Sequence, residues 1–160
     1  MPKYKAMAKE IERKFLVNDE SYKERAIGSE RISQGYISTD PDRTVRVRIK
    51  GEKAFITVKT RNEGCVRNEW EFPIPVADAA EMLDACCGNV LSKTRYYVPA
   101  GDGLTWEVDE FHNLGTPLTV AEIELPSADA AFELAPFIGR EVTGDARYYN
   151  SSLSKGFSAG

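Results

Sequence analysis

The chain has 160 residues, enough for one domain of ordinary size but short for two. Hydrophobic residues make up 42% and charged residues 29%, a composition that is typical of globular proteins and excludes a disordered chain. The formal net charge of −4 argues against nucleic acid as the main partner. No apolar run approaches the ~20 residues that span a bilayer, which excludes a membrane-spanning helix. We expect a single domain over 1–160 in the cytoplasm, with 1–8 as a flexible extension.

Alternation of apolar and polar residues dominates the chain and predicts strands. In chain order, strands are predicted over 10–17, 32–38, 44–50, 54–60, 66–74, 90–98, 104–111 and 118–125. Short helices are predicted over 18–26, 76–86, 126–134 and 146–155. Hairpin-length connections favour antiparallel pairing, and about eight such strands can close a barrel. The predicted fold is mainly β (α+β): an eight-stranded antiparallel closed β-barrel with a few short helices packed outside.

Nearly every predicted strand has one charged face and one apolar face, because successive strand side chains point to opposite sides. Arg46 and Arg48, for example, alternate with Val47. The charged positions are Glu10, Glu12, Lys14, Arg46, Arg48, Lys59, Arg67, Glu69, Glu71, Lys93, Arg95, Glu107, Asp109, Glu122 and Glu124. One interpretation is a structural β-sandwich whose charged face is solvated. The recurring charged doublets favour another, in which these faces line the inside of the barrel.

A charged barrel interior needs a ligand that compensates its charge. Arg binds phosphate oxygens as a fork and Lys binds them as a point charge, so the basic groups favour phosphate. Carboxylates alone would repel a polyphosphate, but a hard divalent cation resolves that conflict. Mg²⁺ is typically held by one or two carboxylates together with phosphate oxygens. The pattern therefore predicts a site for a metal–polyphosphate complex.

Several other conspicuous residues are expected to have ordinary structural roles. His112, the one histidine, follows a predicted strand and is interpreted as a loop residue, not a catalytic base. Trp70 and Trp106 alternate with the charged positions, which favours packing over base stacking. Tyr36 either reaches into the barrel or packs. The cysteines, Cys65 and the pair at 86–87, lack the spacing of a disulfide framework or a zinc site.

The order of the charged motifs carries a family resemblance. Residues 10–14 have the form E-x-E-x-K on the first predicted strand. Further motifs follow along the chain: Gln34-Gly35-Tyr36, Arg46-Val47-Arg48, Lys59, Arg67-x-Glu69-x-Glu71, Lys93-Thr94-Arg95, Glu107-x-Asp109, Glu122-x-Glu124 and the closing segment 145–150. This ordered set, which extends through nearly the whole chain, resembles the CYTH family, the triphosphate tunnel metalloenzymes, in its compact bacterial form.

The resemblance implies a tunnel enzyme that acts on triphosphates with Mg²⁺ or Mn²⁺. It assigns phosphate binding to Lys14, Arg46, Arg48, Lys59, Lys93 and Arg95, with Arg147 closing one tunnel end. It assigns metal binding to Glu10, Glu12, Glu122 and Glu124, with Asp109 as a further candidate. Lys14, Glu69 and Glu71 are the candidate catalytic residues, the two glutamates by supporting metal or orienting water.

The resemblance favours inorganic tripolyphosphate as the substrate, hydrolysed to pyrophosphate and phosphate. ATP and thiamine triphosphate are alternative substrates, and an adenylate cyclase of the fourth class is an alternative activity. A non-catalytic module that binds polyphosphate or nucleotide is a hypothesis of a different kind. The expected partner is a small triphosphate, without nucleic acid or membrane. Because a closed barrel has no free edges, a homodimer would have to use an outer apolar face or the helices.

Overall fold

The structure, a computed structural model, describes residues 5–155 of the chain. The strands are β1 (Lys5–Val17), β2 (Gly28–Ser38), β3 (Thr44–Lys50), β4 (Lys53–Lys59), β5 (Val66–Ile74), β6 (Leu91–Gly101), β7 (Leu104–Phe111), β8 (Thr119–Glu124) and β9 (Ile138–Glu141). The helices are α1 (Tyr22–Arg25), α2 (Val76–Ala85), the 3-10 turn η1 (Ala146–Tyr148) and α3 (Asn150–Leu153). None of these helices is long and apolar enough to cross a membrane.

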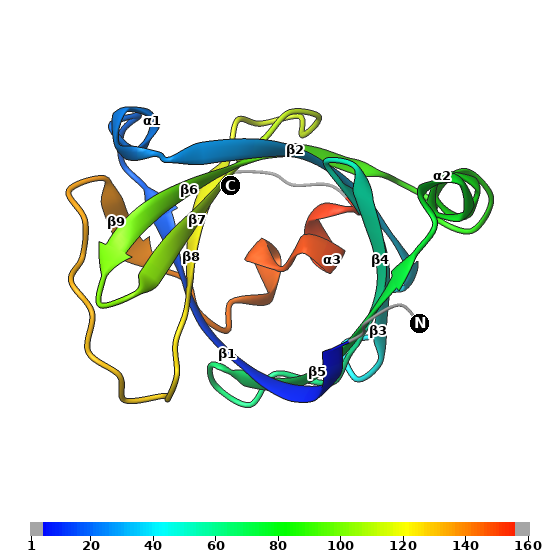
Figure 1. The fold of residues 1–160 in the computed structure, drawn as a ribbon, viewed down its shortest axis with the longest axis horizontal. Coiled ribbons are helices and arrows are strands. Elements are labelled where there is room, and N and C mark those ends of the chain that lie inside the picture. Colours follow the sequence, from blue (N-terminus) through cyan, green and yellow to red (C-terminus); the bar gives the residue numbers. More distant parts are fainter. Residues whose placement is uncertain (1–4, 156–160) are drawn as a thin grey trace.

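The strands form one antiparallel sheet that closes on itself, which confirms the predicted barrel. Neighbours run in the order β5-β4-β3-β2-β6-β7-β8-β1, and pairing of β1 with β5 completes the ring that Figure 1 shows end-on. Strand β9 pairs with the end of β1 and adds an outer strand that the alternation did not predict. Strand β1 begins at Lys5; residues 1–4 of the predicted extension lie outside the described residues.

The apolar faces of the strands point outward, where other segments cover them. Val47 and Ala54 pack beneath Ala79 and Leu83 of α2. Gly35 makes this contact close, since a Cβ there would lie 2.7 Å from the Cβ of Cys87. On the opposite side of the barrel, the larger cluster contains Phe15, Tyr22, Val98, Trp106, Val108, Ala121, Ile123, Leu125, Phe137 and Ile138. Trp106 is therefore a core residue, as predicted.

The helix predicted over 126–134 is wrong: residues 126–137 form an irregular segment. Phe132 of this segment packs edge-on against Phe15 and Trp106, with ring centroids 6.1 and 5.8 Å apart. Ala130 and Ala135 contact the same cluster. An extended path lets the segment cover more of the barrel wall than one short helix would, and this packing overrides local helix propensity.

The C-terminal helix also differs from the prediction that helices pack outside. Figure 1 shows α3 within the ring of strands. Its Leu153 is fully buried against Leu91, Phe111 and Val120, whose side chains form an apolar layer near one end of the barrel. The predicted terminal helix over 146–155 is divided into η1 and α3. The C-terminal segment therefore covers one end of the barrel and helps to define its interior.

Candidate active site: a charged tunnel through the barrel

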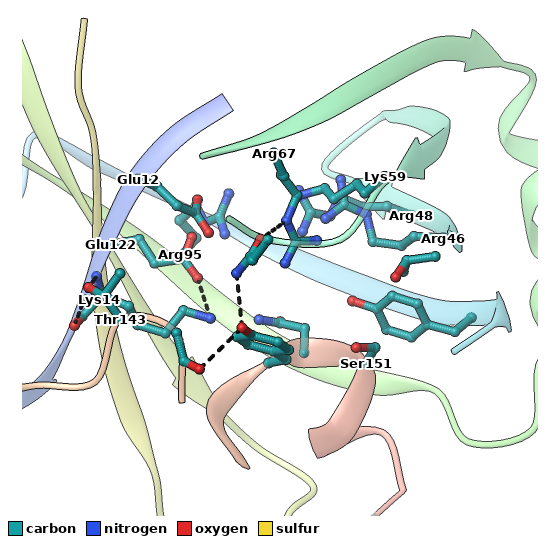
Figure 2. A pocket seen from close by; sticks show the side chains of 16 residues that line it. Glu12, Lys14, Arg46, Arg48, Lys59, Arg67, Arg95, Glu122, Thr143 and Ser151 are labelled. Carbon is teal, nitrogen blue, oxygen red and sulfur yellow. Dashed lines mark hydrogen bonds and ion pairs between the residues drawn. The ribbon is translucent and has the colours of Figure 1, made fainter. Parts of the chain in front are cut away.

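The barrel interior holds a cavity whose walls are mainly cationic. Its lining includes Lys14, Arg46, Arg48, Lys59, Arg67 and Arg95, together with the acidic Glu12 and Glu122. Figure 2 shows these side chains converging from different strands toward one space. Alternation explains the convergence, because the lining residues that share a strand, such as Arg46 and Arg48, are two positions apart and so point to the same side. The interpretation of the charged faces as a barrel lining is confirmed, and the solvated-face interpretation is wrong.

Ion pairs between nearby strands of the barrel wall hold these side chains in place. Lys14 Nζ lies 3.3 Å from Glu122, directly opposite on β8. Lys59 Nζ lies 3.0 Å from Glu10 and 3.7 Å from Glu69. Burial lowers the pKa of Lys14, but Glu122 and Glu12 outweigh burial and raise it overall. Lys14 therefore carries its charge inside a protein wall, where it interacts more strongly with an anion than it would in water. Burial lowers the pKa of Lys59 in spite of Glu10.

A second group lies deeper, where β6 and β7 pair. Asp109 accepts bonds from Arg95 Nε at 2.7 Å and Arg95 Nη2 at 2.9 Å, and from Lys93 Nζ at 2.7 Å. Burial raises the pKa of Asp109, but Arg95 and Lys93 outweigh it, and the pKa falls to about 2. Arg95 Nη1 also lies 3.1 Å from Glu107, so Asp109 and Glu107 together compensate Lys93 and Arg95.

Two further pKa shifts show that buried cations crowd one another in this part of the interior. The pKa of Lys93 is lowered to about 7. Burial is the main cause, Arg95 and Arg48 add to it, and Asp109 opposes it. Burial also lowers the pKa of Arg48, with Arg46 and Arg95 adding to the effect. Cations that repel each other in a buried space gain most from a bound anion. The tunnel is accordingly suited to a strongly anionic ligand.

The interior carboxylates differ in how far cations compensate them. Burial raises the pKa values of Glu10 and Glu122, but Lys59 and Lys14 outweigh burial and lower them overall, whereas Glu12 is not compensated in this way. Burial raises the pKa of Glu12 well above its ordinary range, and the nearby Glu122 and Glu10 raise it further. A hard cation bound among these oxygens would relieve the repulsion. No group of three or more His, Cys, Asp or Glu side chains at metal-binding spacing is present within 5–155. Because Mg²⁺ often takes only one or two carboxylates plus phosphate oxygens, the donor set still fits a metal that arrives with its anion.

Other predicted residues lie at the edges of this arrangement. Glu71 is half-buried, accepts a bond from Thr57 Oγ1 at 3.1 Å and lies 3.5 Å from Arg46. Glu124 is opposite Glu12 in the β1–β8 register but is exposed. Arg147 is not brought to the cavity: 61% of its side chain is exposed, and its guanidinium binds Asp145 at 2.8 Å. This short-range ion pair holds Arg147 on the surface, whereas the resemblance placed it at one end of the tunnel.

The structure adds residues that were not in the predicted set. Arg67 lines the cavity, although its motif was assigned through its glutamates alone. From the C-terminal segment, Thr143, Tyr149, Asn150 and Ser151 also line it. Arg67 could have been found from its alternation with Glu69. The closing segment 145–150 was among the motifs of the resemblance, but the contacts of its Tyr149 and Asn150 could not be found, because no periodic pattern links them to the strands. His112 is exposed beyond β7, as predicted, where its ring contacts Thr94.

Comparison with known proteins places this arrangement in a family. The model of the CYTH domain matches residues 8–155, so the chain belongs to the CYTH domain family. An inorganic triphosphatase from Acetivibrio thermocellus is 48% identical over 150 residues, which cover 93% of this chain and 95% of the relative. An inorganic triphosphatase from Nitrosomonas europaea is 37% identical over 148 residues, covering 91% and 96%.

Solved structures agree with the barrel. A crystal structure of an inorganic triphosphatase is 36% identical and has a TM-score of 0.63, covering 91% of this chain and 93% of its own. The resemblance stated from the motifs is thereby confirmed at the level of family and fold.

Proposed function

We propose that this protein hydrolyses inorganic tripolyphosphate to pyrophosphate and phosphate in the presence of Mg²⁺ or Mn²⁺. The observation that carries the proposal is the ring of cations around one cavity that Glu12 and Glu122 also line. An unesterified triphosphate has the high negative charge density that suits these cations, and a divalent metal bound with it would suit the carboxylates. The similarity to inorganic triphosphatases of two bacteria supports the same substrate class.

The cationic wall binds the phosphate chain. Arginines from β3, β5 and β6 offer forked N–H groups to phosphate oxygens, and Lys14 and Lys59 offer point charges. Charge that develops on the transferred group and on the leaving pyrophosphate is stabilised by these fixed groups, which need no reorganisation during the reaction. Lys14, already held by Glu122, is suited to bind the group that undergoes attack.

The carboxylate wall would hold the metal and direct water. Glu10, Glu12 and Glu122, with Asp109 or Glu124 in support, would supply the metal's oxygen ligands. When bound, a divalent ion polarises phosphate oxygens and lowers the pKa of coordinated water. Glu69 or Glu71 would accept a proton as the water oxygen bonds to the terminal phosphorus and the bond from that phosphorus to the pyrophosphate oxygen breaks.

The products test this proposal. Purified protein is incubated with tripolyphosphate, ATP or thiamine triphosphate and Mg²⁺ or Mn²⁺, and the products are separated by ion exchange. We expect equal amounts of phosphate and pyrophosphate from tripolyphosphate, at the highest kcat/KM of the three substrates. Cyclic AMP with pyrophosphate from ATP would favour a cyclase instead. If no product forms but triphosphate raises the melting temperature, the hypothesis of a non-catalytic binding module would be favoured.

A further inference from the structure

Asn150, the first residue of α3, lines the cavity from the closing segment 145–150, in which the motifs assigned no role to this side chain. Its Oδ1 accepts two hydrogen bonds, one from Lys93 Nζ and one from Gln34 Nε2, each at 2.8 Å. Lys93 and Gln34 are both fully buried, so neither can exchange this contact for water. The amide of Asn150 is therefore part of the fixed hydrogen-bond network of the interior.

The network continues to a second cation. Gln34 Oε1 accepts a bond from Arg48 Nε at 2.8 Å, so Asn150 is connected to Arg48 through one amide. Lys93 donates its other short bond to Asp109 Oδ2 at 2.7 Å. The order of contacts is thus Arg48, Gln34, Asn150, Lys93 and Asp109. Two side-chain amides connect cations that β3 and β6 supply from separate parts of the barrel wall.

The acceptors in this network differ in charge. Asp109 orients Lys93 and Arg95 but cancels part of their charge. Asn150 and Gln34 orient Lys93 and Arg48 with neutral oxygens, so these two contacts cancel none of the charge of either cation. Within the described residues, no carboxylate forms an ion pair with Arg48. The amide oxygen of Gln34 is thus the acceptor that fixes its guanidinium before an anion arrives.

The segment that carries Asn150 is itself fixed on both sides. The carbonyl oxygen of Tyr148 accepts a bond from Lys14 Nζ at 3.0 Å. Leu153 is buried in the apolar layer against Phe111 and Val120. The hydroxyl of Tyr149 accepts a bond from Asn62 at 3.0 Å, which ties the segment to the loop before β5. Asn150 therefore holds a defined position, and its two bonds are not the accidental contacts of a loose tail.

We propose that Asn150 is a positioning residue of the active site, which sets the orientation of Lys93 directly and of Arg48 through Gln34. This inference rests on the proposed function, because its consequence is the alignment of Arg48, which lines the cavity, and of the fully buried Lys93. Without Asn150, Lys93 would keep only its bond to Asp109, and Gln34 Nε2 would keep only its long bond to the Tyr36 hydroxyl at 3.4 Å, which holds the amide less firmly against Arg48. Misplacing such groups by about 1 Å can cost on the order of 100-fold in rate.

The test compares Asn150→Ala and Asn150→Asp with wild type, using Ser152→Ala as a matched control on the same helix. For Asn150→Ala we expect kcat on tripolyphosphate to fall by about 10- to 100-fold, with a melting temperature close to that of Ser152→Ala. Asn150→Asp keeps both acceptor bonds but adds a negative charge beside the phosphate chain. Its kcat should recover to within about fivefold of wild type, while KM rises by at least about fivefold.

A double-mutant cycle with Gln34→Ala adds a second measurement. If both residues act through one network, the losses in kcat of Gln34→Ala and Asn150→Ala will not multiply in the double variant. Wild-type kcat in Asn150→Ala, equal kcat in the Ala and Asp variants, or fully multiplicative losses would each overturn the inference. If Asn150→Ala does not fold, the kinetics of Asn150→Asp and Gln34→Ala still decide, because the inference requires a KM effect in the first and a kcat effect in the second. A wild-type protein that releases no phosphate would contradict the proposed function instead.

Discussion

The inner and outer faces of the same barrel wall are both buried, but they differ in the polarity of the side chains that they bury. Outside, Trp106, Val108 and Ile123 are closed off by the segment 126–137 and lose contact with water. Inside, the residues that alternate with them, such as Asp109 and Glu122, are also buried but remain charged. The outer face gains stability from burial of apolar area. Burial of the inner charges costs stability, and partners or ligands must offset that cost.

Adjacent residues on β1 offer the sharpest way to separate the two faces. Lys14 faces the tunnel, while Arg13 faces outward and pairs with Glu141 at 2.7 Å. Lys14→Ala should lower kcat on tripolyphosphate by at least about 100-fold, as loss of one fixed charge-stabilising group does. Arg13→Ala should leave kcat unchanged. Steady-state kinetics on both proteins, each checked for folding by circular dichroism, measure the contrast, and similar losses in the two would contradict it.

The outer face should respond mainly in stability. Trp106 is fully buried among Phe15, Phe132 and Phe137, with which it makes edge-on ring contacts. Replacing Trp106 with Ala should lower the free energy of unfolding by about 3–5 kcal/mol, because of the cavity that it leaves. Urea unfolding measures this loss, and the smaller change Trp106→Phe serves as the control. An unchanged midpoint would show that the segment 126–137 does not form the cover described.

A smaller effect is expected where α2 meets the barrel. Gly35 has no room for a Cβ, since Cys87 and Leu83 lie within 3.1 Å of its ideal position. Gly35→Ala should therefore cost about 1–3 kcal/mol of unfolding free energy by overpacking. Gly28→Ala on the same strand is the control, because nothing lies within 4 Å of that site. Equal stability of the two variants in thermal unfolding would refute the close contact between α2 and β2.

The smallest effect belongs to the outer ion pair of Arg13 with Glu141. The hydrogen bond from Arg13 lowers the pKa of Glu141, and the pair is partly exposed, so it contributes about 0–1 kcal/mol. A carboxyl whose pKa is lowered by folding adds stability above its unfolded pKa and loses it as pH falls through the folded pKa. The stability difference between wild type and Glu141→Gln should thus narrow below about pH 4.5 in urea titrations. A difference that grows with acid would contradict this sign.

Much of the wall could be predicted from sequence because strand alternation is local. The positions of residues such as Arg46 and Val47 in the strand are enough to assign them to opposite faces of the sheet. The closure of the barrel was predicted from the number of strands and their short connections. The order of charged motifs then pointed to the family. These signals needed no knowledge of contacts between distant parts of the chain.

The failures share a physical cause. Residues 126–134 have helical composition, but Phe132 gains more by packing against Trp106 in an extended path. Asn150 and Gln34 are 116 positions apart in the sequence, and no local periodicity predicts the hydrogen bond between them. Arg147 seemed suited to a tunnel end, yet Asp145 two residues earlier holds it on the surface. Long-range packing and short-range competition decided these positions.

The central claim is that the charged interior is a metal-dependent triphosphate site. Its most direct test is phosphate release from tripolyphosphate by wild type, Glu12→Gln and Lys14→Ala, each with Mg²⁺, Mn²⁺ or EDTA. The account predicts rapid release by wild type with either metal, loss of release in EDTA, and release reduced by at least about 100-fold in both variants. Release that persists in EDTA, or that either variant retains at the wild-type rate, would contradict it.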